Sequence, residues 1–485
     1  MHDLVIEGGT IVTATESFRG DIGITNGTIA TLGKNLDGRE KIDATGRLVL
    51  PGGIEAHCHI AQESATGGMT SDDYSSGSVS AAFGGNTCFI PFAAQHRGMG
   101  IKETLDLYDS RSNGSSVIDY SYHLIIADPT PDVMDRELPD AVARGITSFK
   151  VFMTYDLMKV SDEQFLDILS AAKRHGALTM VHAENSGIIN WVSERLVKGG
   201  YTTPRYHAIS HPEIAEVEAI SRAIMLAKFI DTPLMIVHVS TSEGAELVLK
   251  AKNDGLKIFS ETCPQYLFLD RNDLDRPGYE GAKFICSPPL RTKDTQEALW
   301  KHLQLGTFTI FSSDHSPYRF DKSGKLANGP NATFQQIANG MPGIAMRLPL
   351  LFSEGVNKGR ITLQKFVELS STNAARTYGL LPKKGSISIG ADADLVIWDP
   401  NLKRRVTIDD QHDAMDYTPF EGMEVTGWPM SVIVRGSPVI LDGNFVGSHA
   451  HGKFTPRGKT DLTGFIGHKA AELDIESNFG ADLCS

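Results

Sequence analysis

From about residue 52 onward, short apolar runs alternate with stretches of helical periodicity, and this alternation constrains the fold more than any other feature. Residues 178–181 and 234–237 are four-residue apolar runs typical of buried strands. Residues 161–164 read Ser-Asp-Glu-Gln, a capping box that predicts a helix closed by Gly176, and Pro212 opens a second helical stretch. Repeated strand–helix units predict an α/β fold, and the chain length suits a (β/α)8 TIM-like barrel over residues 52–384.

Side chains that can bind metal follow these apolar runs in a fixed order. In a barrel the C-terminal ends of the strands converge on one mouth, so side chains at those ends meet there. His57 and His59 are two residues apart, which places both rings on the same side of a strand. Imidazole and carboxylate groups suit divalent cations, so we expect two ions per chain. Zinc is the expected metal, and manganese, cobalt and iron are alternatives that suit the same ligands. The predicted ligands are His57, His59, Lys150, His182, His238 and Asp314.

Lys150 is an unusual residue for a metal site because an ammonium group repels cations. Its neighbours Phe149, Val151, Phe152 and Met153 are apolar, and burial disfavours the charged amine. A neutral amine can add CO2 to form a carbamate (N6-carboxylysine), whose two oxygens can bridge two ions. Composition alone favours the alternative, a lysine at the surface or paired with an acid. The order of the surrounding ligands favours the carbamate.

The two ends of the chain have a different texture, with short strands and tight turns. Asn26-Gly27 lies between apolar runs and predicts a hairpin, because both turn positions favour positive φ. Strand-like runs return after Gly385, at residues 393–398 and 431–436. We infer that residues 1–51 and 385–460 fold together as a small flanking β-sandwich domain. Residues 461–485 form a polar C-terminal tail.

Bulk composition excludes several classes of protein. The net charge of −13 argues against binding to nucleic acid or to an anionic membrane surface. No apolar run approaches the roughly 20 residues that a membrane span requires, and the first residues lack the pattern of a secretory signal. The five cysteines have no paired spacing. A reduced, cytoplasmic setting is therefore expected.

With these residues laid out, the chain resembles the dihydropyrimidinase and D-hydantoinase branch of the cyclic amidohydrolases, from residue 1 to about residue 455. The resemblance rests on a first metal motif, a carbamylated-lysine segment, two further ligand strands and two later motifs. These are residues 51–59, 148–155, 181–185, 236–240, 371–376 and 421–427.

The resemblance implies a role for each matching position. His57, His59 and Asp314 would hold one metal ion, and His182 and His238 would hold the second. Carbamylated Lys150 and a hydroxide would bridge the two ions.

The resemblance also implies how a substrate is bound. Tyr155 would donate a hydrogen bond to the substrate carbonyl as it becomes an oxyanion. The backbones around Ser287 and Asn339 would bind the imide and amide edge of the ring. Asp314 would carry a proton from water to the leaving nitrogen.

The implied activity is hydrolysis of the cyclic amide of dihydropyrimidines or 5-substituted hydantoins to N-carbamoyl amino acids, the chemistry of pyrimidine degradation. The implied assembly is a homotetramer. Ala61 stands where dihydroorotases carry a substrate-binding arginine, which argues against that activity. An allantoinase-like or imidase-like cyclic amide hydrolase is an alternative, and so is a non-catalytic scaffold relative. Such scaffold proteins have lost metal ligands, whereas this chain keeps all the expected ones.

The chain departs from the family in the loops expected to line the pocket. Residues 62–68 are smaller and more polar than the usual apolar loop of hydantoinases, and residues 92–97 bring polar and cationic groups near the mouth. We expect a ring substituent that is polar or small. Leu157 and Met158 can still supply an apolar wall. The alternative is that these loops face solvent.

Overall fold

The computed structural model describes residues 1–63 and 68–483. Within them, eight parallel strands run in sequence order through one sheet, with the short β8 (Asp119–Tyr120) paired to its second strand. A parallel bridge between Cys58 and His315, with the His59 N–H donating to the His315 carbonyl at 2.7 Å, joins the first strand to the segment after the last. The predicted barrel is confirmed. Its strands are β6 (Gly53–Cys58), β7 (Asn86–Ala94), β9 (His123–Ile125), β10 (Ser148–Phe152), β11 (Leu178–His182), β12 (Leu234–Ile236), β13 (Ile258–Thr262) and β14 (Ile310–Phe311).

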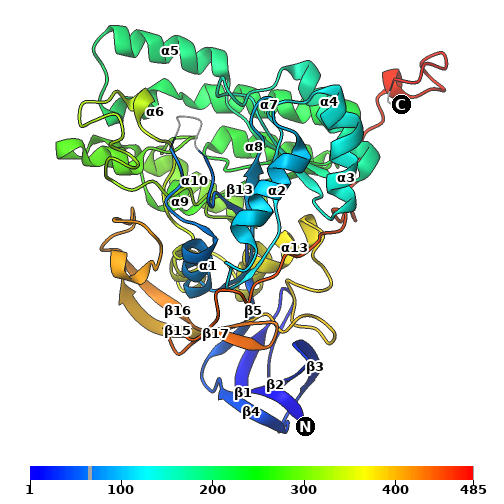
Figure 1. The fold of residues 1–485 in the computed structure, drawn as a ribbon, viewed down its shortest axis with the longest axis vertical. Helices are drawn as coiled ribbons and strands as arrows, with labels where there is room; N and C mark the ends of the chain where they lie inside the picture. Colours follow the sequence, from blue (N-terminus) through cyan, green and yellow to red (C-terminus); the bar gives the residue numbers. More distant parts are fainter. Residues whose placement is uncertain (64–67, 484–485) are drawn as a thin grey trace.

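Helices surround the barrel and join its strands (Figure 1). Those between or beside strands are α1 (Tyr74–Phe83), α2 (Ile101–Ser112), α3 (Leu138–Ala143), α4 (Asp162–His175), α5 (Ser186–Lys198), α6 (His207–Ser210), α7 (Glu213–Ile230), α8 (Ser242–Asn253), α9 (Pro264–Phe268) and α10 (Lys293–Gln304). Three short helices follow β14: α11 (Arg347–Leu351), α12 (Leu363–Val367) and α13 (Asn373–Thr377). No helix of the described residues is long and apolar enough to cross a membrane.

Helix α4 begins at the predicted capping box and ends at the predicted glycine. The Ser161 hydroxyl accepts the Gln164 N–H, the Gln164 side chain returns to the Ser161 N–H, and Gly176 closes the helix at φ 73°. α7 begins directly after Pro212, as predicted, and its buried face carries residues such as Val217, Ile220 and Ile224. Ile214 in its first turn is 56 % exposed.

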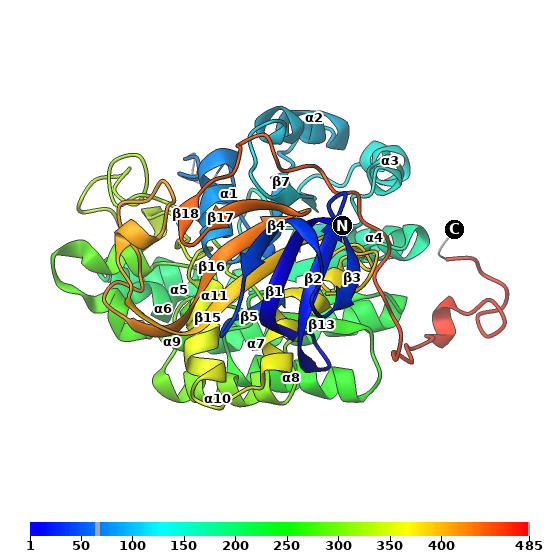
Figure 2. The ribbon, with the colours of Figure 1, turned by 90° about the horizontal axis from the view of Figure 1, so that it is seen from below.

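Strands from both chain ends form a second, mixed sheet, which lies below the barrel in Figure 1 and in front of it in Figure 2. The junction is antiparallel pairing of β5 with β15, in which Val49 lies opposite Ile397. The sheet is the predicted flanking β-domain, while the exact limits of the domains stay a prediction. Its strands are β1 (His2–Val12), β2 (Ser17–Thr25), β3 (Thr28–Gly33), β4 (Gly38–Asp43), β5 (Leu48–Pro51), β15 (Leu395–Arg405), β16 (Glu424–Val434), β17 (Ser437–Leu441) and β18 (Asn444–Phe445).

A bend in β1 lets this one sheet enclose its own core. The register of β1 shifts between Ile6 and Gly9, and Gly8 has φ 72°. The first half of β1 pairs with β4 and the second half with β5. The predicted Asn26-Gly27 turn joins β2 to β3, with both residues at positive φ. Apolar side chains from both chain ends, such as Ile22 and Leu395, fill a core separate from that of the barrel.

Candidate metal and substrate site

The predicted ligands come from strand ends at one mouth of the barrel. His57 lies in β6, Lys150 in β10 and His182 at the last residue of β11, while His238 and Asp314 follow β12 and β14. All of them line one cavity of about 130 Å³. The complete set of predicted site residues on its wall is His57, His59, Lys150, Tyr155, His182, His238, Ser287, Asp314 and Asn339.

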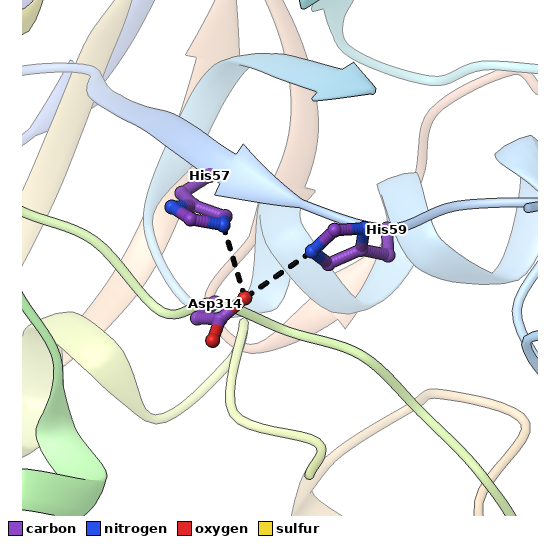
Figure 3. Close-up of side chains that lie close together, drawn as sticks. All are labelled: His57, His59 and Asp314. Atoms are coloured by element: carbon purple, nitrogen blue, oxygen red, sulfur yellow. Dashed lines mark hydrogen bonds and ion pairs between the residues drawn. The ribbon is translucent and has the colours of Figure 1, made fainter. Parts of the chain in front are cut away.

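Three of these residues form a compact group at the end of β6. The Nε2 atoms of His57 and His59 lie 3.0 and 3.2 Å from the same oxygen, Oδ1 of Asp314 (Figure 3). The ligand atoms of the three side chains lie within 4.8 Å of one another. Two imidazoles and a carboxylate at this spacing are a donor set that suits zinc and similar divalent ions.

The second nitrogen of each histidine in this group is held by a side chain behind it. His57 Nδ1 contacts Oε1 of the buried Glu261, and His59 Nδ1 lies 2.8 Å from Oε1 of Gln62. An imidazole whose Nδ1–H is donated to an oxygen keeps Nε2 as its lone-pair donor. Glu261 and Gln62 therefore orient both rings toward Asp314.

His182 and His238 form a second pair across the pocket. Their ring centroids are 4.5 Å apart, and the His238 ring lies 5.5 Å from that of His57. His182 Nε2 lies 2.7 Å from the buried carboxylate of Glu184. The buried Nδ1 of His238 has no hydrogen-bond partner in the described part of the chain. An orphaned buried nitrogen is costly, and a metal ion would satisfy it.

The side chain of Lys150 reaches the pocket between apolar residues. Its side chain is 1 % exposed, and Nζ lies 5.2 and 5.1 Å from the ring centres of Phe92 and Phe152. Burial lowers the pKa of Lys150 to about 8, although the carboxylates of Asp314 and Glu261 oppose that change. An appreciable fraction of the amine is therefore neutral near physiological pH, as carbamate formation requires.

Tyr155 lies between the histidines and the segments that carry Ser287 and Asn339. Its ring centroid is 5.3 Å from that of His182. Burial raises the pKa of Tyr155 strongly, although Ser287 and Asn339 act in the opposite direction, so the side chain stays a hydroxyl donor.

Three residues that line this pocket have a strained backbone conformation. Tyr155, His238 and Asp314 have φ values of 68°, 38° and 50°, in the left-handed region that non-glycine residues seldom adopt. Each such residue costs on the order of 1–3 kcal/mol and is retained when the surrounding structure holds it. The backbone conformations that position these three side chains are therefore unfavourable for stability.

The charges of the site favour a cation. Burial on its own would raise the pKa of Asp314, but His57 and His59 hold it well below its ordinary value. Burial would likewise lower the pKa of His57, yet the carboxylates of Glu261 and Asp314 raise it to about 9. Burial lowers the pKa of His59, His182 and His238, so these three rings stay neutral, the form in which an imidazole binds a metal ion. The residues present therefore suit the predicted ions.

Several residues around the site were not singled out from the sequence. Glu261 is the last residue but one of β13 and is distant in sequence from His57, so only the closed barrel brings the two together. Glu184 could have been predicted as a site residue, because it lies two residues after His182 and residues two apart in an extended chain point to the same side. Gln62 and Glu63 line the pocket mouth, and Arg111 binds the Glu63 carboxylate. Residues 64–67 of the predicted polar loop lie outside the described residues.

The sequence and the fold are similar to those of known proteins. The sequence pattern of the amidohydrolase family matches residues 48–439, and the chain belongs to that family. Within it, the chain is 46 % identical to a D-hydantoinase from Geobacillus stearothermophilus, over 94 % of this chain and 96 % of that protein. It is 37 % identical to a D-phenylhydantoinase from Escherichia coli, over 94 % and 98 %.

Solved structures give the same result. A crystal structure of D-hydantoinase superimposes with a TM-score of 0.91 at 44 % identity, covering 94 % of this chain and 99 % of that one. A dihydropyrimidinase from Brevibacillus agri superimposes with a TM-score of 0.91 at 39 % identity, with the same coverage. The expected resemblance to the dihydropyrimidinase and D-hydantoinase branch is confirmed.

Proposed function

We propose that this protein is a binuclear-metal hydrolase that opens the cyclic amide of dihydropyrimidines or 5-substituted hydantoins, giving N-carbamoyl amino acids. The observation that carries the proposal is the pocket that gathers four histidines, Lys150 and Asp314 in a member of the amidohydrolase family. Relatives named D-hydantoinase support the same class of reaction.

The metal assignments are part of the proposal. His57, His59 and Asp314 hold one ion, His182 and His238 hold the other, and Lys150 joins them as a carbamate formed with CO2. When bound, the ions supply an acidified water and polarise the scissile carbonyl. Zinc is the proposed metal because imidazole and carboxylate ligands suit it. The orphaned Nδ1 of His238 supports this assignment.

The protein's own groups perform the remaining steps. Tyr155 donates its hydroxyl hydrogen to the carbonyl oxygen as negative charge develops there. Asp314 accepts the proton of the attacking water and delivers it to the ring nitrogen as the C–N bond breaks. The backbones around Ser287 and Asn339 bind the polar edge of the ring and hold its carbonyl against Tyr155.

The proposed ring substituent is polar or small. Gln62 and Glu63 line the mouth of the pocket, where the loops of the branch meet the substituent. Arg97 donates to the carbonyls of Leu157 and Lys159, which holds the loop after Tyr155. Leu157 is 62 % exposed, so Met158 is the apolar residue of this loop that lines the cavity.

We also propose a cellular compartment, an oligomeric state and a class of binding partner for the enzyme. Cys58, Cys88, Cys263 and Cys286 are buried and unpaired, which fits a reducing, cytoplasmic compartment. The proposed assembly is a homotetramer, by resemblance to the dihydropyrimidinase and D-hydantoinase branch. The proposed partners are cyclic amide or imide substrates, and neither a nucleic acid nor a membrane is among them.

Metal content and turnover of one purified sample test the proposal. We expect about two ions per chain, with ring opening of dihydrouracil or hydantoin exceeding that of 5-phenylhydantoin. A strong preference for the phenyl compound would contradict the polar pocket. Two metals without turnover of these rings would favour an allantoinase-like or imidase-like substrate. No metal and no turnover after supply of zinc and bicarbonate would favour a scaffold protein.

A further inference from the structure

A lysine that takes no part in the chemistry above is buried beside the pocket. Lys325 is 0 % exposed, and its ammonium donates to the carbonyl oxygens of Ile285 at 2.8 Å and Ala338 at 2.7 Å. Within the described residues, no carboxylate forms a salt bridge with it. The loop that carries it is fixed, because the Lys325 N–H donates to the Arg319 carbonyl at 2.8 Å.

Burial of this charge is unfavourable for stability. Removing an ammonium from water costs several kcal/mol unless an opposite charge offsets it, and here two neutral carbonyls are the partners. Burial lowers the pKa of Lys325 to about 7. An apolar side chain at this position would lower the free-energy cost of folding, so stability does not explain a lysine here. The location of its two carbonyl partners provides a better explanation.

The two carbonyls belong to the segments that line the substrate pocket. Ile285 lies two residues before Ser287, and Ala338 directly precedes Asn339. The Gly340 N–H also donates to the Ile285 carbonyl at 3.0 Å, so the two segments lie side by side. Lys325, which is not among the residues that line the pocket, therefore joins the two segments through its ammonium.

The ammonium also changes the peptide groups that it contacts. The Ala338 carbonyl and the Asn339 N–H belong to one peptide unit, and a cation on the oxygen makes that N–H a stronger donor. The same holds for the unit that joins Ile285 to Cys286. Hydrogen bonds that polarise one another in this way are stronger than isolated ones.

We propose that Lys325 is a positioning residue for substrate: it clamps the 285–287 and 338–340 segments together and strengthens their backbone donors toward the polar edge of the ring. The inference rests on the proposed function, because it takes this edge of the pocket as the ring site. The residue touches neither the metal ligands nor the scissile carbonyl. Its effect is therefore on ring binding and alignment.

Lys325→Met keeps the length of the side chain and removes its charge. We expect KM for hydantoin at pH 6.5 to rise about 10- to 100-fold, the range for loss of hydrogen bonds to a charged group. We expect kcat to change much less and metal content to stay as in the wild type. Lys252→Met is the matched control, since Lys252 also donates to two carbonyls, of Gly306 and Thr307, away from the pocket. Its KM should not move.

Added ethylammonium provides a second test that does not depend on how well Lys325→Met folds. In Lys325→Ala the amine can occupy the vacated space, and we expect it to lower KM toward the wild-type value. Unchanged KM in Lys325→Met, or no amine rescue in Lys325→Ala, would overturn the inference while wild-type turnover still supports the proposed function. A wild-type protein without turnover would instead fail the proposed function itself.

Discussion

Lys150 differs from the other proposed metal ligands, because its side chain must react with CO2 before it can bind. We predict that Lys150→Ala loses both metal ions and nearly all turnover, since the carbamate that would bridge the two ions is removed. Added short carboxylates such as acetate should restore part of the activity by replacing the bridge. Metal analysis and turnover of the same sample check this. A variant with two ions and full turnover would show that the bridging role is wrong.

Tyr155 supplies one hydrogen bond in the proposed transition state. We predict that Tyr155→Phe keeps its metal and lowers kcat by ~10²–10³, the usual loss when one oxyanion donor is removed. The ring still packs against His182, so the fold should not change. Steady-state kinetics and metal content are the measurements. An unchanged kcat would remove Tyr155 from the oxyanion role.

Asp413 provides a test of pH dependence at a residue that is not a proposed metal ligand. Burial and the neighbouring carboxylate of Asp72 raise the pKa of Asp413 from 3.8 to about 7. Between these values the folded chain holds a proton that the unfolded chain releases, so stability falls as pH rises from about 4 to about 7. Asp413→Asn has no carboxyl group at this position, so this fall in stability with rising pH should be absent. We expect it to melt higher than the wild type at pH 8 and close to it at pH 4.5. An equal difference at both pH values would contradict the assignment.

Single elements carry stability that can be measured separately from activity. In α4 the Ser161 cap satisfies the Gln164 N–H at the start of the helix. We predict that Ser161→Ala destabilises the protein by ~1 kcal/mol, the usual effect of losing an N-cap acceptor. Ser161→Asp keeps an acceptor and is the matched control, which should unfold near the wild-type temperature. Thermal unfolding followed by circular dichroism is the measurement, and equal midpoints for Ser161→Ala and Ser161→Asp would contradict the capping role.

Elements with local signals could be predicted, and those decided by distant contacts could not. The α4 cap and the Asn26-Gly27 turn are each contained in a few consecutive residues. The approach of the predicted ligands could be inferred because parallel strands place their C-terminal ends at one mouth. The contact of Glu261 with His57, and the burial of Lys325 against two carbonyls, depend on how the closed barrel aligns remote segments. The hydrophobic periodicity of the sequence does not predict contacts between such remote segments.

At the scale of the whole molecule, Lys384 connects the barrel to the β-domain. Its ammonium lies 2.7 Å from Asp119 of β8, 3.0 Å from Asp392 and 2.6 Å from Asp394. Removing one partner of a buried ionic group costs about 3–5 kcal/mol because the remaining charges stay buried. We predict that Lys384→Met lowers the melting temperature while metal content and KM at 25 °C are retained.

The neighbouring Lys383 is exposed, and Lys383→Met is the matched control for Lys384→Met. Differential scanning calorimetry of both variants gives the comparison. Equal melting temperatures for the two variants would contradict a role of Lys384 in joining the barrel to the β-domain.

The pairing of β5 with β15 has a consequence for synthesis on the ribosome. β5 ends at Pro51, and its partner strand begins at Leu395, after the entire barrel. At translation rates of about 5–20 residues per second, the edge of β5 remains unpaired for on the order of tens of seconds. The β-domain is thus begun before the barrel and completed after it, and during this interval the open edge of β5 is exposed to mispairing.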